Sequence, residues 1–521
     1  MQALSTRRSF CRSGLLAGAV LLSPARRLLS ATSTRTIHLR TDAEIGLVRP
    51  ELHGHFAEHL GSCIYGGLWV GPDSPIPNIR GHRKEAVEYL KALGIPVLRW
   101  PGGCFADDYH WRDGIGPRDK RPRRVNIHWG NYVEDNSFGT HEFIELCRLI
   151  GAEPYLAGNV GSGTPQELRD WVEYCNYPSG STLADERAAN GSPEPFRVRY
   201  WGIGNENWGC GGQMTPEEYA GHYRRFAVYV RQFGDVRPFL IACGPNRNNT
   251  DWTQRFLATM YPGRRFVRMD GYAMHFYSNG RLPATKFTAD ALREQMATFA
   301  DLERGILQQR AILDGYDPER RVGLLIDEWG VWDRMVPEEE KTYGRLWQQN
   351  TIRCAVAAAL GLNVFHRQAD KLVMCNIAQT VNVLHALLLT HGDKCIRTPS
   401  YYAFELARPH RGQTAIKVDN PDTDPNGLSV SASRKDDTLA LTCVNPRHDE
   451  TFEVSASLSR GRLESASARI LHHPDMNAHN SFDSPNVVVP KDHRVELGAA
   501  GLRLVLPPLS VVTVLGRLRE S

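Results

Sequence analysis

The chain has 521 residues, of which 23% are charged, and its formal net charge of +4 leaves positive and negative side chains nearly balanced. No long basic or acidic run occurs in its body, which argues against nucleic acid as a partner. The length is enough for two domains, one of which could be a (β/α)8 barrel of roughly 250 to 400 residues.

The N-terminal segment has the pattern of an export signal. A twin-arginine pair, Arg7 and Arg8, precedes the apolar run 14–22, which is too short to span a bilayer as a helix. We therefore predict a signal over residues 1–31 and a periplasmic or secreted protein; the alternative is a frayed basic terminus with a short buried helix. Nothing later is long and apolar enough to predict a membrane span in the mature chain.

The next elements alternate between strand and helix. Residues 32–49 contain one strand-like stretch with no helix after it, which we predict to join a sheet outside the barrel. Strands with helices between them are then expected near residues 52–56, 95–100, 154–157, 197–201, 239–243, 272–277, 322–326 and 372–379. A count near eight predicts a (β/α)8 TIM barrel over residues 50–400, with its active site at the carboxyl ends of the strands.

Beyond about residue 400 the helical periodicity disappears. Short alternating runs such as 439–444 and 502–506 are separated by Asn, Asp, Pro and Gly. They predict a C-terminal antiparallel β-sandwich, jelly-roll-like, over residues 401–521, to which the early strand could return. We expect packing and assembly to be its role.

Two of the barrel strands end in a glutamate. Glu206 follows the strand 197–201, and Glu328 closes the apolar run 322–326. Hydrolysis of a glycosidic bond needs one carboxyl group to protonate the leaving oxygen and a second to attack or to activate water. We predict Glu206 as acid/base, because Asn205 beside it can bind a sugar 2-hydroxyl, and Glu328 as nucleophile, kept ionised by Arg99. Retention would place the two carboxyl groups roughly 5–5.5 Å apart.

Each of these residues also has a structural interpretation. A single glutamate at a strand end is more often salt-bridged than catalytic, and tryptophans are as often core residues as sugar contacts. Histidines such as His53, His55, His59 and His275 fit structural or substrate hydrogen bonds better than metal ligation. The eleven cysteines show no CxxC or Cys/His ligand spacing, so we predict no metal, no cofactor, and mostly buried free thiols with room for one or two bridges.

Several motifs together resemble glycoside hydrolase family 51, the α-L-arabinofuranosidases. They are residues 54–61 (GHFAEHLG), 98–103 (LRWPGG), 113–117 (DGIGP), 204–209 (GNENWG), 327–329 (DEW) and 376–379 (NIAQ). The resemblance covers nearly the whole mature chain. It implies a retaining, exo-acting enzyme that removes terminal arabinofuranose from plant polysaccharides or oligosaccharides, with a C-terminal β-sandwich and a homo-oligomeric assembly.

The resemblance also assigns site residues by motif position. It gives Glu206 and Glu328 the same catalytic roles as the chemical reasoning. The substrate contacts that we expect are Glu58, Arg99, Cys104, Asn205, His275, Tyr277 and Gln379, with Trp129, Trp208 and Trp332 as walls.

One position departs from the family pattern. Many members read Pro-Gly-Gly-Asn, with the Asn contacting the sugar, whereas this chain has Cys104 after Gly103. A thiol is a weak donor and acceptor. We expect either that Asp107, Asp108 or His110 takes over this contact, or that the preferred sugar differs.

Two other functions remain open from the sequence. A retaining β-glycanase of the endoglucanase or xylanase kind could use the same barrel, and an open cleft would favour it. A non-catalytic glycan-binding protein is the second alternative, but such a protein need not keep an acid and a nucleophile together.

Overall fold

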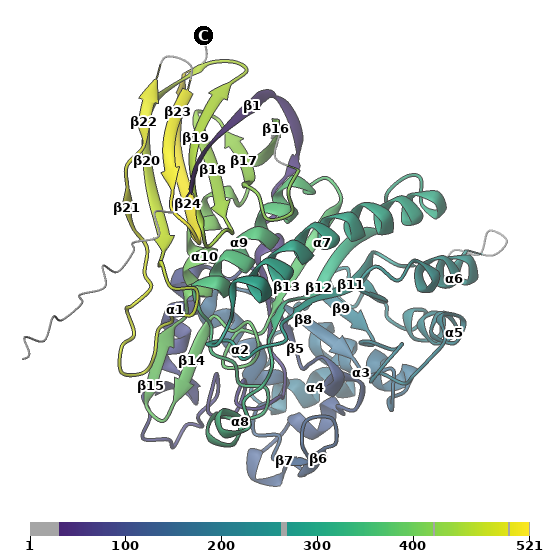
Figure 1. Cartoon of the computed structure of the whole chain (residues 1–521). Helices are drawn as coiled ribbons and strands as arrows, with labels where there is room; N and C mark the ends of the chain where they lie inside the picture. Colours follow the sequence, from purple (N-terminus) through teal and green to yellow (C-terminus); the bar gives the residue numbers. More distant parts are fainter. Residues whose placement is uncertain (1–30, 262–267, 420–422, 499–500, 520–521) are drawn as a thin grey trace, which may run out of the picture.

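The computed structural model describes residues 31–261, 268–419, 423–498 and 501–519. A barrel and a β-sheet domain pack against each other, with α9 and α10 between them (Figure 1). The predicted export signal lies outside the described residues, apart from Ala31, which begins the first strand.

The larger domain is a closed parallel barrel, as predicted. Its strands, in order around the barrel, are β10 (Phe239–Asn246), β11 (Gly271–Asn279), β12 (Gly323–Trp332), β13 (Leu372–Ala378), β2 (Gly54–Phe56), β5 (Val97–Trp100), β8 (Glu153–Gly158) and β9 (Tyr200–Ile203). Each expected strand corresponds to one of these eight. β13 pairs with β2 in parallel, Ile377 opposite His55, and so closes the ring.

Helices surround the barrel. They are α1 (Lys84–Leu93), α2 (Thr140–Ile150), α3 (Pro165–Asn176), α4 (Thr182–Ala189), α5 (Pro216–Ala227), α6 (Thr250–Met260), α7 (Ala289–Tyr316), α8 (Pro337–Tyr343), α9 (Ile352–Arg367) and α10 (Pro399–Ala407). Short 3-10 turns are η1 (Pro50–His53), η2 (Cys104–Asp107), η3 (Trp111–Gly114), η4 (Arg118–Lys120) and η5 (Arg408–His410). Small hairpins are β3 (Asn78–Ile79) with β4 (His82–Arg83), β6 (Arg124–Asn126) with β7 (Tyr132–Glu134), and β14 (Leu388–His391) with β15 (Lys394–Arg397).

Local sequence signals explain where α5 begins after β9 and where α3 begins after β8. The Thr215 side chain accepts from the Glu218 backbone N–H, and the Glu218 carboxylate accepts from the Thr215 backbone N–H. Together these two bonds form a complete capping box at the start of α5. At α3 the box is half formed: Thr164 accepts from the Glu167 N–H, but the Glu167 carboxylate binds His110 instead. These caps define the first residue of each helix. They therefore set the length of the loops between β8 and α3 and between β9 and α5.

The second domain is one curled sheet. Its order is β21 (Lys491–His493), β20 (Arg462–His472), β24 (Ser510–Arg519), β18 (Thr438–Asn445), β17 (Ser429–Lys435), β16 (Thr414–Asp419), β1 (Ala31–Leu47), β19 (Glu450–Leu458), β23 (Gly501–Leu506) and β22 (Glu496–Gly498). Its inner faces enclose a separate apolar core.

The paired strands of residues 401–521 are antiparallel to one another, as predicted, and the sheet is mixed only through β1. β1 pairs antiparallel with β16 but parallel with β19. A hairpin forces antiparallel neighbours, whereas β1 enters from before the barrel and shares no hairpin with either neighbour. Its direction is therefore free to match β19.

The sheet domain also contacts the barrel on the side where the barrel strands end. The segment between β20 and β21 returns to the barrel, where the Asn477 side chain accepts from the Phe287 backbone N–H at 2.8 Å. The Ala478 carbonyl accepts from the Ile352 N–H, and Asn480 donates to the Arg397 carbonyl. These contacts fix loops that follow β11, β12 and β13.

Among the described residues, none of the helices is long and apolar enough to cross a membrane.

Candidate active site

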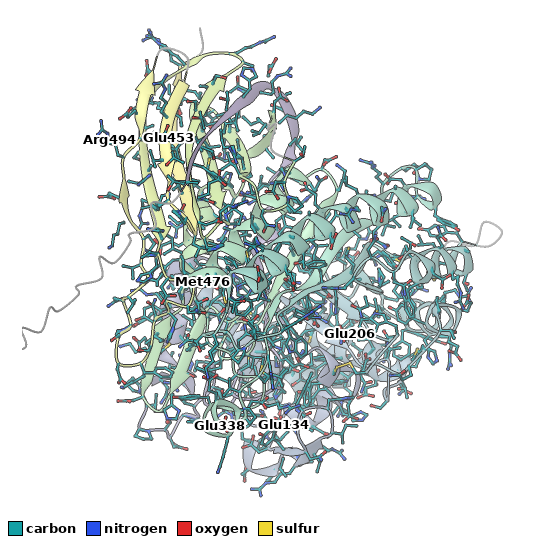
Figure 2. All side chains as sticks on the ribbon, viewed as in Figure 1. Glu134, Glu206, Glu338, Glu453, Met476 and Arg494 are labelled. Carbon is teal, nitrogen blue, oxygen red and sulfur yellow. A yellow bond between two sulfur atoms is a disulfide. The ribbon has the colours of Figure 1, made fainter. Side chains whose placement is uncertain are left out.

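Both glutamates lie at the carboxyl ends of barrel strands. Glu206 follows β9 and Gly204, whose φ of 82° suits glycine, and Glu206 itself has a φ of 44°. A Cβ on Gly204 would come within 2.3 Å of Asn207 Oδ1. The turn is therefore tight, and it directs Glu206 over the barrel, well away from Glu453 and Arg494 of the sheet domain (Figure 2).

His275 on β11 lies between the two carboxyl groups. Its Nδ1 is 2.8 Å from Glu206 Oε1 and 3.6 Å from Glu328 Oε2. The ligand atoms of these three residues all lie within 4.8 Å of one another. An oxygen of Glu206 and one of Glu328 thus lie within 4.8 Å, which fits the spacing of about 5–5.5 Å between the carboxyl groups of retaining glycosidases better than the roughly 6.5–9.5 Å of inverting ones.

Arg99 and Tyr277 hold Glu328. Arg99, 1% exposed, places one guanidinium nitrogen 2.8 Å from Glu328 Oε1 and another 2.5 Å from Asn205 Oδ1. The Tyr277 hydroxyl donates to Glu328 Oε2 at 2.7 Å. Burial disfavours the charged form of Glu328, but the charges of His275 and Arg99 outweigh it and lower its pKa. Glu328 is thus an ionised carboxylate suited to nucleophilic attack.

Glu58, on the loop after β2, is held by three N–H donors. Its Oε1 accepts from Trp129 Nε1 at 2.9 Å and from the Phe105 backbone at 3.1 Å, and its Oε2 accepts from Gln379 Nε2 at 3.0 Å. Burial and the charge of Glu328 nevertheless raise the pKa of Glu58 to about 8. A protonated Glu58 can donate a hydrogen bond at neutral pH.

Two buried amides have an atom free for a ligand. Asn205 Nδ2 and Gln379 Oε1 have no hydrogen-bond partner within the described part of the chain, although each residue is 1% exposed. Buried polar atoms in proteins are normally paired. Both atoms are therefore available to sugar hydroxyls.

The three tryptophans are each half-buried near this site. Trp129 binds Glu58, Trp332 stands edge-on to Tyr277 with ring centroids 5.3 Å apart, and Trp208 donates to the Gly244 carbonyl at 3.1 Å. Their role as sugar walls stays a prediction.

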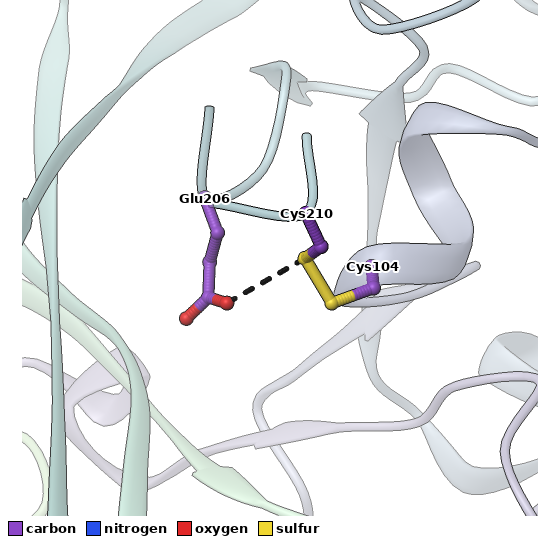
Figure 3. A group of neighbouring side chains, drawn as sticks. All are labelled: Cys104, Glu206 and Cys210. Atoms are coloured by element: carbon purple, nitrogen blue, oxygen red, sulfur yellow. Dashed lines mark hydrogen bonds between the residues drawn. A yellow bond between two sulfur atoms is a disulfide. The ribbon is translucent and has the colours of Figure 1, made fainter. Parts of the chain in front are cut away.

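Cys104 is neither a free thiol nor a simple replacement for asparagine. It forms a disulfide with Cys210, four residues after Glu206 (Figure 3). Cys104 is the first residue of η2, and Asp107 is the last. The eight other cysteines in the described ranges are free and buried, in line with the expectation of mostly buried thiols and one or two bridges.

The polar residues after Cys104 have other partners. Asp107 accepts from the backbone N–H groups of Val160 and Gly161 through Oδ1, and of Asn205 through Oδ2 at 2.8 Å. His110 pairs with Glu167 at 2.9 Å. Which of Asp107, Asp108 and His110 takes over the contact expected of the missing asparagine stays a prediction.

Sequence reasoning missed the residues that support Arg99. Asp327 Oδ2 lies 3.3 Å from Arg99 Nε and accepts from the Tyr155 hydroxyl at 2.7 Å, while Asn376 donates to Asp327 Oδ1. Asp327 could have been suspected, since it precedes Glu328. Tyr155 carries no comparable signal.

Two clusters have the ligand types that a metal needs, but their atoms already have partners. Cys104, Cys210 and Glu206 are close together, yet both sulfurs are in the bridge and offer no thiolate. Glu206, His275 and Glu328 are paired with one another and with Arg99. The prediction of no metal and no cofactor stays a prediction.

Comparisons with known proteins match this arrangement. A family model described as the α-L-arabinofuranosidase C-terminal domain matches residues 327–510, and one described as α-L-arabinofuranosidase 1 domain matches residues 89–295. An intracellular exo-α-L-arabinofuranosidase of Bacteroides ovatus is 42% identical, over 93% of this chain and 96% of its own length. The chain belongs to the α-L-arabinofuranosidases of glycoside hydrolase family 51.

Solved structures of this arabinofuranosidase family superimpose closely. The family 51 arabinofuranosidase of Xanthomonas axonopodis pv. citri gives a TM-score of 0.89 at 38% identity, over 93% of this chain and all of its own. The arabinose complex of an α-L-arabinofuranosidase from Thermotoga maritima gives a TM-score of 0.83 at 31% identity, over 93% of this chain and all of its own. This arabinofuranosidase is therefore a glycosidase of a retaining family, and the alternatives of a β-glycanase and of a silent glycan-binding protein are set aside.

Proposed function

We propose that this arabinofuranosidase releases terminal α-L-arabinofuranosyl residues from plant polysaccharides or oligosaccharides, using Glu206 as acid/base and Glu328 as nucleophile. The observation that carries the assignment is the cluster of Glu206, His275 and Glu328, with ligand atoms within 4.8 Å, beside the buried Arg99. The retaining, exo-acting function of the family fits a two-carboxyl site of this spacing.

In the first step a Glu328 oxygen attacks the anomeric carbon while Glu206 gives its proton to the departing glycosidic oxygen. The bond from the anomeric carbon to that oxygen breaks, and an ester to Glu328 forms. His275 binds Glu206 Oε1, so Oε2 is the oxygen left to carry the transferred proton. Asn205 Nδ2 and Gln379 Oε1, together with Glu58, are the proposed contacts to the sugar hydroxyls.

In the second step Glu206, now a carboxylate, takes a proton from water, and the water oxygen attacks the anomeric carbon. The ester breaks and Glu328 leaves as a carboxylate. Arg99 and the Tyr277 hydroxyl are already bound to its two oxygens. They stabilise the charge that returns to Glu328 without having to move.

The test is hydrolysis of an aryl α-L-arabinofuranoside by the purified protein and by Glu206→Ala and Glu328→Ala. Glu453→Ala, in an exposed position of the sheet domain, is the matched control. Each active-site variant should lose about 100-fold or more in kcat, since positioned proton transfer alone contributes about 10²–10⁴-fold. Aryl β-D-xyloside, β-D-glucoside and β-D-galactofuranoside test the sugar, and NMR of the first product tests retention.

Retained activity in these variants would overturn the residue assignment. If either variant kept more than about a tenth of the wild-type kcat, that glutamate would be neither proton donor nor nucleophile. Turnover of another furanoside in preference to the arabinoside would change the sugar.

We also propose that the protein is exported. The twin arginines Arg7 and Arg8 support this, and so does the disulfide, since disulfides persist mainly outside the reducing cytosol. The Bacteroides ovatus relative, by contrast, is described as intracellular. Fractionation of cells that express the full chain or its Arg7→Lys/Arg8→Lys variant decides between the two: export predicts periplasmic activity that the variant loses, and activity confined to the cytoplasm in both contradicts it.

The division of the chain into 32–49, 50–400 and 401–521 and a homo-oligomeric assembly are likewise proposals. Limited proteolysis that leaves stable fragments ending close to these boundaries would support the division, and light scattering of the purified protein should give at least twice the mass of one chain, which is 58.5 kDa for the full sequence. A mass of one chain would contradict the oligomer.

A further inference from the structure

The Cys104–Cys210 disulfide lies against the proposed proton donor. Cys210 Sγ is 3.7 Å from Glu206 Oε2, and Figure 3 shows the bridge alongside the carboxyl group. Both valences of this sulfur are used by its Cβ and its partner sulfur, so it has no hydrogen to donate. The contact therefore places a polarisable, weakly accepting atom beside Oε2, where a thiol or a hydroxyl would place a donor.

Oε2 is the oxygen that matters for proton transfer. Oε1 is bound to His275, which leaves Oε2 to hold the proton that the glycosidic oxygen receives. The Glu206 side chain is 18% exposed, and both cysteines are half-buried. The bridge therefore borders the side of Glu206 from which the leaving group departs.

The disulfide is also the covalent tether from η2 to the Glu206 loop, beside the hydrogen bonds of Asp107, whose Oδ2 accepts from Asn207 Nδ2 at 3.4 Å. Asp107, at the end of η2, accepts from the Asn205 N–H on one side of Glu206. Cys104, at the start of η2, holds Cys210 on the other side. Between the tethers Glu206 has a left-handed backbone, φ 44°, which costs energy in a non-glycine residue unless neighbouring contacts hold it.

We propose that the Cys104–Cys210 disulfide is a positioning element for proton donation: it fixes Glu206 Oε2 toward the glycosidic oxygen and gives the leaving group an apolar contact. This inference rests on the proposed role of Glu206 as acid/base. Without the bridge the loop is still held at Asn205, Asn207 and Trp208, but Oε2 loses its fixed neighbour and the loop loses its bond at Cys210.

The consequence depends on the leaving group. A sugar alcohol needs a proton as it departs, whereas a dinitrophenolate departs without one. Displacement of Glu206 should therefore slow the first step for an arabino-oligosaccharide and leave it almost unchanged for dinitrophenyl α-L-arabinofuranoside. A loss of general structural integrity would slow both.

The experiment measures kcat/KM, which reports the first irreversible step, for both substrates. The proteins are the wild type, Cys104→Ala/Cys210→Ala, and Cys175→Ala, which removes a buried free thiol from α3 as the matched control. We expect the double variant to lose about tenfold or more on the oligosaccharide and less than about twofold on the dinitrophenyl substrate, because misplacement by about 1 Å can cost about 10²-fold. Cys175→Ala should keep the wild-type kcat/KM on both substrates.

Reduction of the wild type provides a second arm if the double variant folds poorly. The protein is reduced in the presence of EDTA, because two thiolates and a carboxylate whose ligand atoms lie within 4.8 Å would bind zinc. The same reductant on the double variant is the control. Reduction should reproduce the selective loss in the wild type and change nothing in the variant.

Three results would overturn the proposal: equal losses on both substrates, no loss on either, or loss on the dinitrophenyl substrate alone. Failure of the proposed function would look different. A wild-type protein that hydrolysed neither arabinofuranoside, or a Glu206→Ala variant that kept full activity on the oligosaccharide, would refute the acid/base assignment itself.

Discussion

Tyr277 and Tyr155 form a matched pair for testing how the proposed nucleophile, Glu328, is supported. Each hydroxyl donates at 2.7 Å to one of two adjacent carboxylates, Tyr277 to Glu328 and Tyr155 to Asp327. A hydrogen bond to a charged group contributes about 1.5–3 kcal/mol. Replacing either tyrosine by phenylalanine should therefore lower the free energy of unfolding by a similar amount.

The two variants should differ in catalysis. When Glu328 leaves the glycosyl-enzyme, charge returns to the oxygen that Tyr277 contacts, so Tyr277→Phe loses this stabilisation in the second step. At about 1.4 kcal/mol per tenfold in rate, 1.5–3 kcal/mol corresponds to about 10- to 100-fold in kcat. Tyr155→Phe should change kcat by less than about threefold, because Asp327 takes no part in the chemistry.

The assay is steady-state and burst kinetics with an activated aryl arabinofuranoside. Tyr277→Phe should release a burst of phenol, since the glycosyl-enzyme accumulates, and Tyr155→Phe should show none. The Tyr277 hydrogen bond favours the charged form of Glu328 and lowers its pKa, so its loss raises this pKa and moves the acidic limb of the pH profile upward. Equal kcat losses in the two variants, or full kcat in Tyr277→Phe, would refute the reasoning.

Two further predictions concern stability. Gly204→Ala should lower the free energy of unfolding by more than about 1 kcal/mol, because its φ is 82° and the added Cβ meets Asn207 Oδ1 at 2.3 Å; urea unfolding measures it, and an unchanged midpoint would contradict the turn geometry. Burial lowers the pKa values of His53, His366 and His410 below 6.5, to about 3 for His410, so the stability that these neutral histidines allow is present above pH 6.5 and lost as pH falls toward 3. The free energy of unfolding should therefore fall with pH between pH 6 and 4, and His410→Asn should make this slope shallower by about 1.4 kcal/mol per pH unit. An unchanged slope in pH-dependent urea unfolding would mean that His410 is charged in the folded protein.

The sequence predicted the barrel well because each strand has a local signature. The run 322–326 is apolar throughout, as a strand buried on both faces must be, and the glutamates follow such strands directly. Parallel strands bring their carboxyl ends to one face, so Glu206 and Glu328 could be placed together although 122 residues separate them. The parallel pairing of β1 with β19 had no local signal, because it depends on how a distant strand enters the sheet.

The supporting contacts of the site could not be predicted in this way. Cys104 and Cys210 are 106 residues apart, and spacing alone cannot pair two of many cysteines. The backbone N–H partners of Asp107 have positions that only the folded loops define. The place of His275 between Glu206 and Glu328 had no local signal either, and its expected substrate contact stays a prediction.

The charges of the site explain how carboxyl groups at one barrel mouth can differ in protonation. Arg99 contacts Glu328, whose pKa is lowered with the help of His275, and Glu328 is ready to attack as a carboxylate. Glu58 and Asp107 are buried too, but they are held by neutral N–H donors, and burial raises their pKa values to about 8 and about 7. Neutral donors stabilise a carboxylate less than a guanidinium does, so the protons remain on Glu58 and, in part, on Asp107 near neutral pH. Arg99 also contacts Asp327, but only Glu328 combines that contact with a place beside His275 and Glu206, and this combination supports Glu328 as the proposed nucleophile.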